Sequence, residues 1–366
     1  MLSGIYAHTL NAFLLSLVLV AGIRRFAPAF NLVDIPDARK MHEGTVPLCG
    51  GVAVFAAFMA SSIGLERYLQ FPWPWQMGLG MLVLLGVIDD RWRLPPAPRL
   101  AIQALAAALL ISALPAPLNL GQFGGLMPFA LSATASAALC IFFLVGTINA
   151  TNMMDGVDGL AGVSVAGALF WLALVAVHIG DARIAMHSLI LLAAVLGFLV
   201  FNLRHPWQPK ASVFLGDGGS LMLGAALAFF IIGLSSGLNS PAFPILLWIV
   251  IVPIMDTLSL IARRVANRRN PLSPDRWHLH HLLIDSGVSP ARTTALIAAA
   301  SALCGAIGYL GVVLHMSDIA MAAGLLVPML THSATVLVLS SRPRRVRWMA
   351  DAAAAVQPVP PRSNWP

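Results

Sequence analysis

Long apolar runs dominate this sequence and limit its fold more than any other feature. At about 17–25 residues, each run can cross a hydrocarbon core of roughly 30 Å as a helix rising 1.5 Å per residue. The chain is 58% hydrophobic and only 10% charged, whereas soluble domains carry about 25% charged residues. We therefore predict an all-α integral membrane protein, a polytopic bundle of about eleven transmembrane helices. The predicted spans are 5–24, 48–64, 75–88, 99–114, 130–148, 160–179, 183–201, 215–234, 241–262, 292–314 and 319–340.

The basic residues predict the orientation of this bundle. If the N-terminus is periplasmic and the C-terminus cytoplasmic, only Arg67 and Arg183 of the 22 Lys and Arg lie outside. Cytoplasmic loops of membrane proteins are enriched in Lys and Arg, so this asymmetry favours that orientation. Anionic headgroups of membrane lipids and anionic substrates account for the net charge of +7. A nucleic-acid partner is not expected.

The spans form one predicted membrane domain over residues 1–341. Residues 342–366 form a basic, Pro-rich cytoplasmic tail that we expect to be disordered. Cys49, Cys140 and Cys304 lie in or at the ends of apolar spans, where we expect neither a disulfide nor a metal cluster.

Acidic residues gather on the predicted cytoplasmic face. Of the 15 Asp and Glu, only Glu66, Asp181 and Asp318 fall outside. Carboxylates at membrane depth are energetically costly, so they are candidates for function. Polar residues are concentrated in five cytoplasmic segments that could converge on one cleft: 34–42, 89–90, 149–159, 216–219 and 273–281.

Two adjacent carboxylates, Asp89 and Asp90, end the third predicted span. Such a pair can divide labour, one acting as a base and the other as a metal ligand or orienting group. The alternative is a polar stop that merely ends the helix in water. A pair alone does not decide between the two interpretations.

The segment 149–159 carries Asn149, Asn152, Asp155 and Asp158. Their oxygens suit a hard cation such as Mg²⁺. Asn and Asp are also common helix caps, but four together exceed what capping needs.

Asp217 begins the eighth predicted span and could be a simple helix cap. However, the predicted helices that start near residues 160 and 215 both begin on the cytoplasmic side. Their positive dipole ends and free N–H groups then point at the same water, an arrangement that suits a diphosphate.

Arg276, His278, His280 and His281 lie in a long basic loop. A zinc site is one interpretation of these histidines, but the carboxylate-rich remainder favours a hard cation. We favour contacts with phosphate and sugar over a solvated loop held at lipid headgroups. Within the spans, Asp256 is equally well interpreted as a functional carboxylate or as the buried partner of an Arg. Five other histidines are interpreted as structural: His8, His178, His187, His315 and His332.

Together these segments resemble the polyprenyl-phosphate N-acetylhexosamine-1-phosphate transferase family, which serves bacterial O-antigen, common-antigen and teichoic acid synthesis. The resemblance rests on Asp-x-Pro-Asp-x-Arg-Lys-x-His, Asp-Asp, Asn-Ala-x-Asn-Met-x-Asp-Gly-x-Asp-Gly-Leu, Phe-x-Gly-Asp-x-Gly-Ser and Ser-Pro-x-x-x-x-His-x-His-His. It implies ten or eleven transmembrane helices and a Mg²⁺-dependent reaction, with Mn²⁺ able to substitute. Undecaprenyl phosphate and a UDP-N-acetylhexosamine would give the lipid-diphosphate sugar and UMP. UDP-GlcNAc is favoured, and the FucNAc and QuiNAc donors are alternatives.

The resemblance also implies roles for individual residues. Asp89 would be the base, with Asp90 beside it, and Asp217 the Mg²⁺ ligand, helped by Asn152. Asp158 would meet the uracil. The substrate-binding candidates are Lys40, His42, Arg93, Arg99, Asn149, Asp155, Asp158, Arg276, His278, His280 and His281.

Arg93 departs from the family pattern. Enterobacterial members carry a third Asp at this position, and the peptidoglycan-precursor branch carries Lys. A metal site built from three aspartates is therefore in doubt here, and Arg93 is expected to contact phosphate.

Two other classes of protein fit less well. An intramembrane prenyltransferase would show Asn-x-x-x-Asp-x-x-x-Asp, whereas Asn152, Asp155 and Asp158 are three apart. A transporter would place ionisable groups near the membrane midplane on broken helices. We expect a multi-pass protein of the bacterial inner membrane whose active site faces the cytoplasm. A homodimer is a hypothesis that no residue pattern supports.

Overall fold

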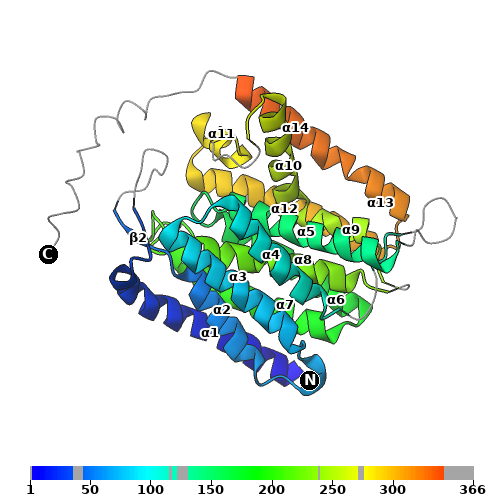
Figure 1. Ribbon diagram of the computed structural model, residues 1–366, viewed down its shortest axis with the longest axis horizontal. Coiled ribbons are helices and arrows are strands. Elements are labelled where there is room, and N and C mark those ends of the chain that lie inside the picture. The colour runs from blue at the N-terminus through cyan, green and yellow to red at the C-terminus, as the bar shows by residue number, and fades with distance from the viewer. Residues whose placement is uncertain are drawn as a thin grey trace.

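The protein is almost entirely helical in the computed structural model, which describes residues 2–35, 44–114, 118–121, 131–237, 240–270 and 276–341. The long helices lie side by side in one bundle, with α1 to α3 and α12 to α14 on opposite sides (Figure 1). The helices are α1 (Leu2–Phe26), α2 (Gly50–Ser62), α3 (Trp73–Trp92), α4 (Pro96–Ile111), α5 (Ala133–Met154), α6 (Leu160–Ile179), α7 (Ala182–Asn202), α8 (Gly216–Leu234), α9 (Phe243–Leu247), α10 (Ile251–Ala266), α11 (Leu279–Asp285), α12 (Pro290–Val313), α13 (Asp318–Gly324) and α14 (Leu326–Ser341). Short 3-10 turns are η1 (Ala27–Phe30), η2 (Arg67–Leu69) and η3 (Trp248–Val250), and the strands β1 (Val33–Asp34) and β2 (Val46–Pro47) pair antiparallel.

The predicted fold class, an all-α multi-pass membrane protein, is confirmed. Eight helical segments of the described chain are long and apolar enough to cross a membrane, and α2 and α4 are shorter apolar helices. A helix overlaps each of the eleven predicted spans. The count of eleven crossings and their direction stay predictions. The predicted tail, 342–366, lies outside the described residues.

Two of the predicted spans are broken, and each break lies four residues before a proline. The ninth span passes from α9 through η3 to α10, and residue 249 in η3 is four before Pro253. The last span breaks where α13 ends at Gly324, four before Pro328. Proline has no N–H and its ring clashes with the carbonyl four residues earlier, which accounts for both breaks.

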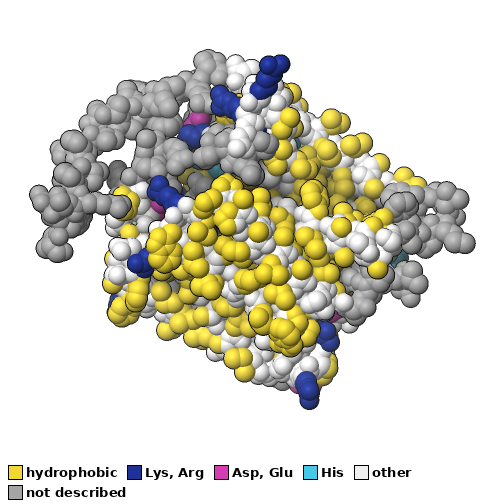
Figure 2. Space-filling model, viewed as in Figure 1, with side chains coloured by type: hydrophobic (Ala, Val, Ile, Leu, Met, Phe, Trp, Pro, Cys, Tyr) yellow, Lys and Arg dark blue, Asp and Glu magenta, His cyan; other side chains and the backbone are white. Residues whose placement is uncertain are grey.

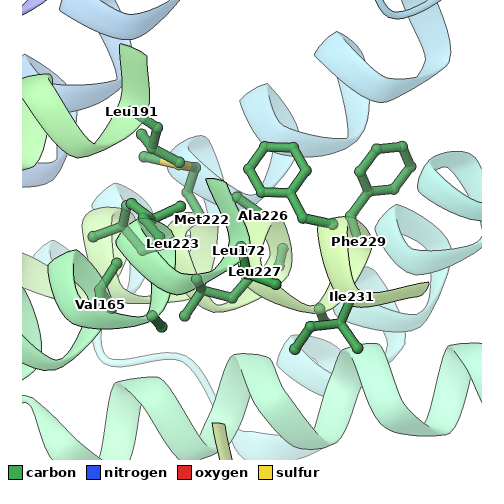
Figure 3. Packing of buried hydrophobic residues seen from close by; sticks show 14 of the residues in the cluster. Val165, Leu172, Leu191, Met222, Leu223, Ala226, Leu227, Phe229 and Ile231 are labelled. Carbon is green, nitrogen blue, oxygen red and sulfur yellow. The ribbon is translucent and has the colours of Figure 1, made fainter. Parts of the chain in front are cut away.

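Helix α8 forms the centre of the bundle. It contacts α2, α3, α5, α6 and α7, and all its residues are buried except Asp217 and Gly233. A helix that is apolar on every side is stable only when surrounded by other apolar elements. Figure 3 shows this packing, with side chains of α6 and α7 around those of α8; the labelled residues are Val165, Leu172, Leu191, Met222, Leu223, Ala226, Leu227, Phe229 and Ile231.

The outer surface is apolar over a wide area. Large hydrophobic side chains such as Leu10, Leu303 and Leu330 are more than half exposed. Figure 2 shows such side chains covering most of one face, with Lys and Arg at its edges. Soluble monomers rarely expose contiguous apolar patches of this kind, so this face is suited to lipid.

Glycines bring α2 and α3 into close contact with the first turn of α8. A Cβ at Gly51 would overlap the backbone of Gly219, and a Cβ at Gly86 would overlap that of Gly218. Small residues at helix contacts let backbones approach closely within a membrane. These glycines therefore fix how near the polar end of α3 comes to the start of α8.

Gly86→Ala is expected to destabilise the protein by about 1–3 kcal/mol, because the added methyl group must push α3 and α8 apart. Thermal unfolding in detergent measures this. The matched control is Gly167→Ala in α6, where a Cβ would meet no atom within 4 Å. Equal unfolding temperatures for the two variants would contradict the proposed close packing.

Candidate active site

The carboxylate of Asp90, at the end of α3, caps the start of α8. Its Oδ1 and Oδ2 lie 3.2 and 3.0 Å from the backbone nitrogen of Asp217, which donates to them. Gly216 has φ +75°, and a Cβ there would meet Asp90 Oδ2. The first N–H groups of a helix lack partners within it, and a carboxylate is a favourable acceptor for them. The sequence Gly216-Asp217 thus allows a carboxylate of another helix to approach this terminus.

Asn152, near the end of α5, holds the side chain of Asp217. Its Nδ2 donates to Asp217 Oδ1 at 2.7 Å and to the Ser220 hydroxyl at 2.9 Å. The carboxyl of Asp217 also interacts with that of Asp89. Residues predicted from three separate segments therefore meet at one place.

Asp89 is buried and fully engaged. Its side chain is 3% exposed, its Oδ2 forms an ion pair with Arg99 Nη1 at 2.5 Å, and its Oδ1 accepts from the backbone N–H of Leu94 at 2.7 Å. The Arg99 side chain is 24% exposed, so part of it reaches the surface of the site. The pair links the end of α3 to the first turn of α4.

Arg93 ends α3 in a left-handed conformation, with φ 52°. Its backbone N–H donates to the Asp89 carbonyl at 2.8 Å, and its side chain is exposed. Left-handed non-glycine residues are uncommon. Here the conformation turns the chain from α3 towards α4, which positions Arg99 beside Asp89.

Asn202 joins the segments that precede α6 and α8. Its Oδ1 accepts from the backbone N–H of Gly159 at 2.9 Å, and its Nδ2 donates to the Val213 carbonyl at 2.8 Å. The two helix starts therefore lie near one another, as the predicted orientation of α6 and α8 required. Because Asn202 is buried, these bonds are shielded from water.

Asp158 lies against the loop that joins α7 to α8. Its Oδ2 accepts from Arg204 Nε at 2.8 Å and from the backbone N–H of Ala211 at 3.0 Å. Asn149, also a predicted substrate contact, instead donates to Gln103 Oε1 at 2.6 Å and so joins α5 to α4.

The histidine segment packs on the turn between α5 and α6. A Cβ at Gly156 would meet His280 Nε2, and the His280 and His281 rings lie 4.2 Å apart. Burial, together with the neighbouring His281 and His278, holds the pKa of His280 well below its usual range. His280 is therefore neutral at pH 7.

At the start of α11, His278 Nδ1 lies 2.7 Å from Asp256 Oδ2. Asp256, which had two open interpretations, also pairs with His332. Arg276 pairs with Asp285 at 3.0 Å. The predicted contacts Lys40 and His42 lie outside the described residues.

Comparison with known proteins places the chain in a family. The sequence profile of glycosyl transferase family 4 matches residues 73–235. The undecaprenyl-phosphate alpha-N-acetylglucosaminyl 1-phosphate transferase of Haemophilus influenzae is 33% identical over 328 residues, which cover 88% of this chain and 90% of that protein. The chain belongs to glycosyl transferase family 4. Enzymes of the same name are 31% identical in Escherichia coli K12, over 84% of this chain and 83% of that protein, and 30% identical in Yersinia pestis, over 82% of each.

The resemblance found in the motifs is thus confirmed, and the protein is a glycosyl transferase enzyme. The family profile spans the helices that carry Asp89, Asp90, Asn152 and Asp217. These residues are the ones that the structure gathers at the junction of α3, α5 and α8.

A family transferase of this kind is expected to use Mg²⁺, and the residues fit that ion. The described residues hold no ready-made cage of three His, Cys, Asp or Glu. Mg²⁺ is usually held by one or two carboxylates together with water and substrate phosphates, so it needs no such cage. Asp217 offers a carboxylate. The amide nitrogen of Asn152 donates hydrogen bonds to Asp217 and Ser220, so Asn152 could bind a cation only through its carbonyl oxygen.

Four residues that contact the candidate site or the histidine segment were absent from the predicted set. Gln103, Asn202 and Arg204 orient predicted residues, and His332 was interpreted as structural. Gln103 is a fully buried amide in α4, whose other residues after Arg99 are all apolar, and this is a usable signal. Asn202 and Arg204 follow an apolar span on the same face as the acidic segments.

Proposed function

We propose that this transferase moves GlcNAc-1-phosphate from UDP-GlcNAc to undecaprenyl phosphate at the cytoplasmic face of the bacterial inner membrane. An oxygen of the lipid phosphate attacks the sugar-bearing phosphorus. The diphosphate bond breaks and UMP leaves with the bridging oxygen. The relatives named for this reaction support the substrates. The convergence of Asp89, Asp90 and Asp217 at the polar end of α3 supports the site.

Asp89 is the base in this proposal, and its ion pair with Arg99 determines when its carboxylate is free to accept a proton. The incoming lipid phosphate would displace Asp89 from the guanidinium of Arg99, whose side chain is partly exposed. Guanidinium binds phosphate as well as carboxylate. Asp89 would then be released to accept the proton of the lipid phosphate, while Arg99 offsets the charge of that anion.

Asp90 and Asn152 position Asp217 on this account. The Asp90 carboxylate fixes the first turn of α8 through the Asp217 N–H, and Asn152 fixes the Asp217 side chain. Mg²⁺, or Mn²⁺ in its place, would be held by Asp217 and the Asn152 oxygen and would offset the charge of the donor diphosphate. Asp155, Asp158 and the segment of Arg276, His278, His280 and His281 would contact the UDP sugar, and Arg93 its phosphates.

UMP release from purified protein tests the substrates. We expect release to require undecaprenyl phosphate and Mg²⁺, to stop with EDTA, and to show its highest kcat/KM with UDP-GlcNAc among the GlcNAc, GalNAc, FucNAc and QuiNAc donors. Reactions without the lipid are the control for hydrolysis of the donor. Release with another donor alone would replace the sugar in this proposal, and release without the lipid would overturn the acceptor.

A further inference from the structure

The last helix of the described residues, α14, contacts the histidine segment through the carboxylate of Asp256. His332 on α14 places its Nε2 at 3.2 Å from Asp256 Oδ1 on α10. The other oxygen of Asp256 lies 2.7 Å from His278 Nδ1, and Oδ1 also accepts from the Leu279 N–H at 2.9 Å. Asp256 therefore ties α14 to the first residues of α11.

These groups are shielded from water. The exposed fractions of the side chains are 13% for Asp256, 8% for His278 and 7% for His332. A buried carboxylate is tolerated when hydrogen bonds compensate for lost hydration. Three donors meet Asp256 here, so removing one leaves part of a buried charge unsatisfied.

These contacts also determine which ring nitrogen of His278 and of His332 carries a hydrogen. Asp256 accepts, so the nitrogens that face it carry hydrogen, Nδ1 of His278 and Nε2 of His332. The carboxylate thereby orients the His278 ring and leaves its Nε2 as the nitrogen available to a ligand. Carboxylates that accept from the other ring nitrogen of a functional histidine orient its ring in the same manner.

The segment held by Asp256 in turn packs on the turn that carries Asp155 and Asp158. His280 packs against Gly156. Leu279 and Leu283 of α11 join Val157 in a small hydrophobic cluster. A rotation at the start of α11 would therefore move this turn.

We propose that His332 is a positioning residue that acts through Asp256 on His278, so that α14 completes the donor side of the active site. His332 lies outside residues 73–235, the range of the family profile. The inference rests on the proposed function, because the His278 segment is taken to meet the UDP sugar.

Two substitutions with matched chemistry test the link. The amide nitrogen of Gln can occupy the place of a His Nε2, whereas that of the shorter Asn occupies the place of Nδ1. We expect His332→Asn to raise the KM for UDP-GlcNAc and lower kcat/KM for it by about 10–100-fold, the usual loss when a residue that orients a functional side chain is replaced. The KM for undecaprenyl phosphate should stay unchanged. His332→Gln should recover kcat/KM to within about 3-fold.

The controls separate positioning from a general structural role. His178→Asn, at an exposed site at the end of α6, should leave both KM values unchanged. In a His278→Ala background, adding His332→Asn should cost less than about 2-fold, because coupled residues are not additive. Equal kinetics for the Asn and Gln variants, a loss confined to kcat, or full additivity with His278→Ala would overturn the inference.

Binding distinguishes this outcome from a failure of the proposed function. If the wild type releases no UMP, the proposed reaction is wrong. The Kd of UDP-GlcNAc, measured by titration of purified protein without lipid, then decides the positioning role. It should rise about 10-fold in His332→Asn and not in His332→Gln. Equal Kd values for the wild type and His332→Asn would overturn the role of His332.

Discussion

Asp217→Asn is expected to reduce UMP release by at least about 1,000-fold, because an amide cannot supply the negative charge that a cation and its bound diphosphate need. The substitution keeps the size of the side chain, and the amide oxygen can still accept from Asn152 Nδ2. The backbone N–H that donates to Asp90 is untouched. Folding should therefore be retained. The measurement is initial rate against Mg²⁺ concentration.

Asp181→Asn is the matched control for this change. Asp181 caps α7, where its carboxylate accepts from the Ile184 N–H at 2.9 Å. Asn caps helices as well as Asp does. We expect this variant to keep its rate within about 2-fold. If Asp217→Asn retains more than about a tenth of the wild-type rate, Asp217 does not hold the essential cation.

Convergence of the acidic segments followed from the sequence because alternating spans return every second connection to the same face. That argument places Asp89, Asn152 and Asp217 on one side without any knowledge of packing. It does not say which side chains touch. The capping of α8 by Asp90 depends on how closely α3 approaches α8, which Gly86 and Gly218 permit. The bond from Asn152 to Asp217 depends on how closely α5 approaches α8, which Gly224 permits.

Pairings between distant helices could not be predicted in the same way. Asn149 resembles the ligands near it in sequence, yet its partner Gln103 lies on α4, 46 residues away. His332 resembles any polar residue of an apolar helix, and only its contact with Asp256, 76 residues away, links it to the histidine segment. One polar residue in an apolar span is compatible with many partners, so its partner can be identified only when the packing of the helices is known.

The broken spans were predictable in principle. Pro253 and Pro328 lie inside runs that read as continuous helices by hydropathy alone. Each proline removes a hydrogen bond from the residue four positions earlier, and the chain breaks there. The first break matters for the site, because α10 begins there and carries Asp256, which contacts His278.

Breaking the Asp89–Arg99 pair is expected to separate stability from catalysis. Arg99→Met leaves the buried carboxylate of Asp89 without its cation, and removal of one partner of a buried pair costs about 3–5 kcal/mol. Asp89→Asn removes the charge itself. It should lower UMP release by about 100–10,000-fold, the usual contribution of a general base, with a smaller loss of stability because Arg99 can reach water.

The double variant, Asp89→Asn with Arg99→Met, decides between the two roles. It buries no uncompensated charge, so its unfolding free energy should return to within about 1 kcal/mol of Asp89→Asn alone. UMP release should be no higher than in Asp89→Asn, because the base is still absent and the proposed contact of Arg99 with the lipid phosphate is lost as well. Arg292→Met, at an exposed position near the start of α12, is the control for loss of a surface Arg and should shift stability by less than about 0.5 kcal/mol. Recovery of activity together with stability would show that Asp89 serves the fold alone, and the proton would then need another acceptor among the carboxylates at the end of α3.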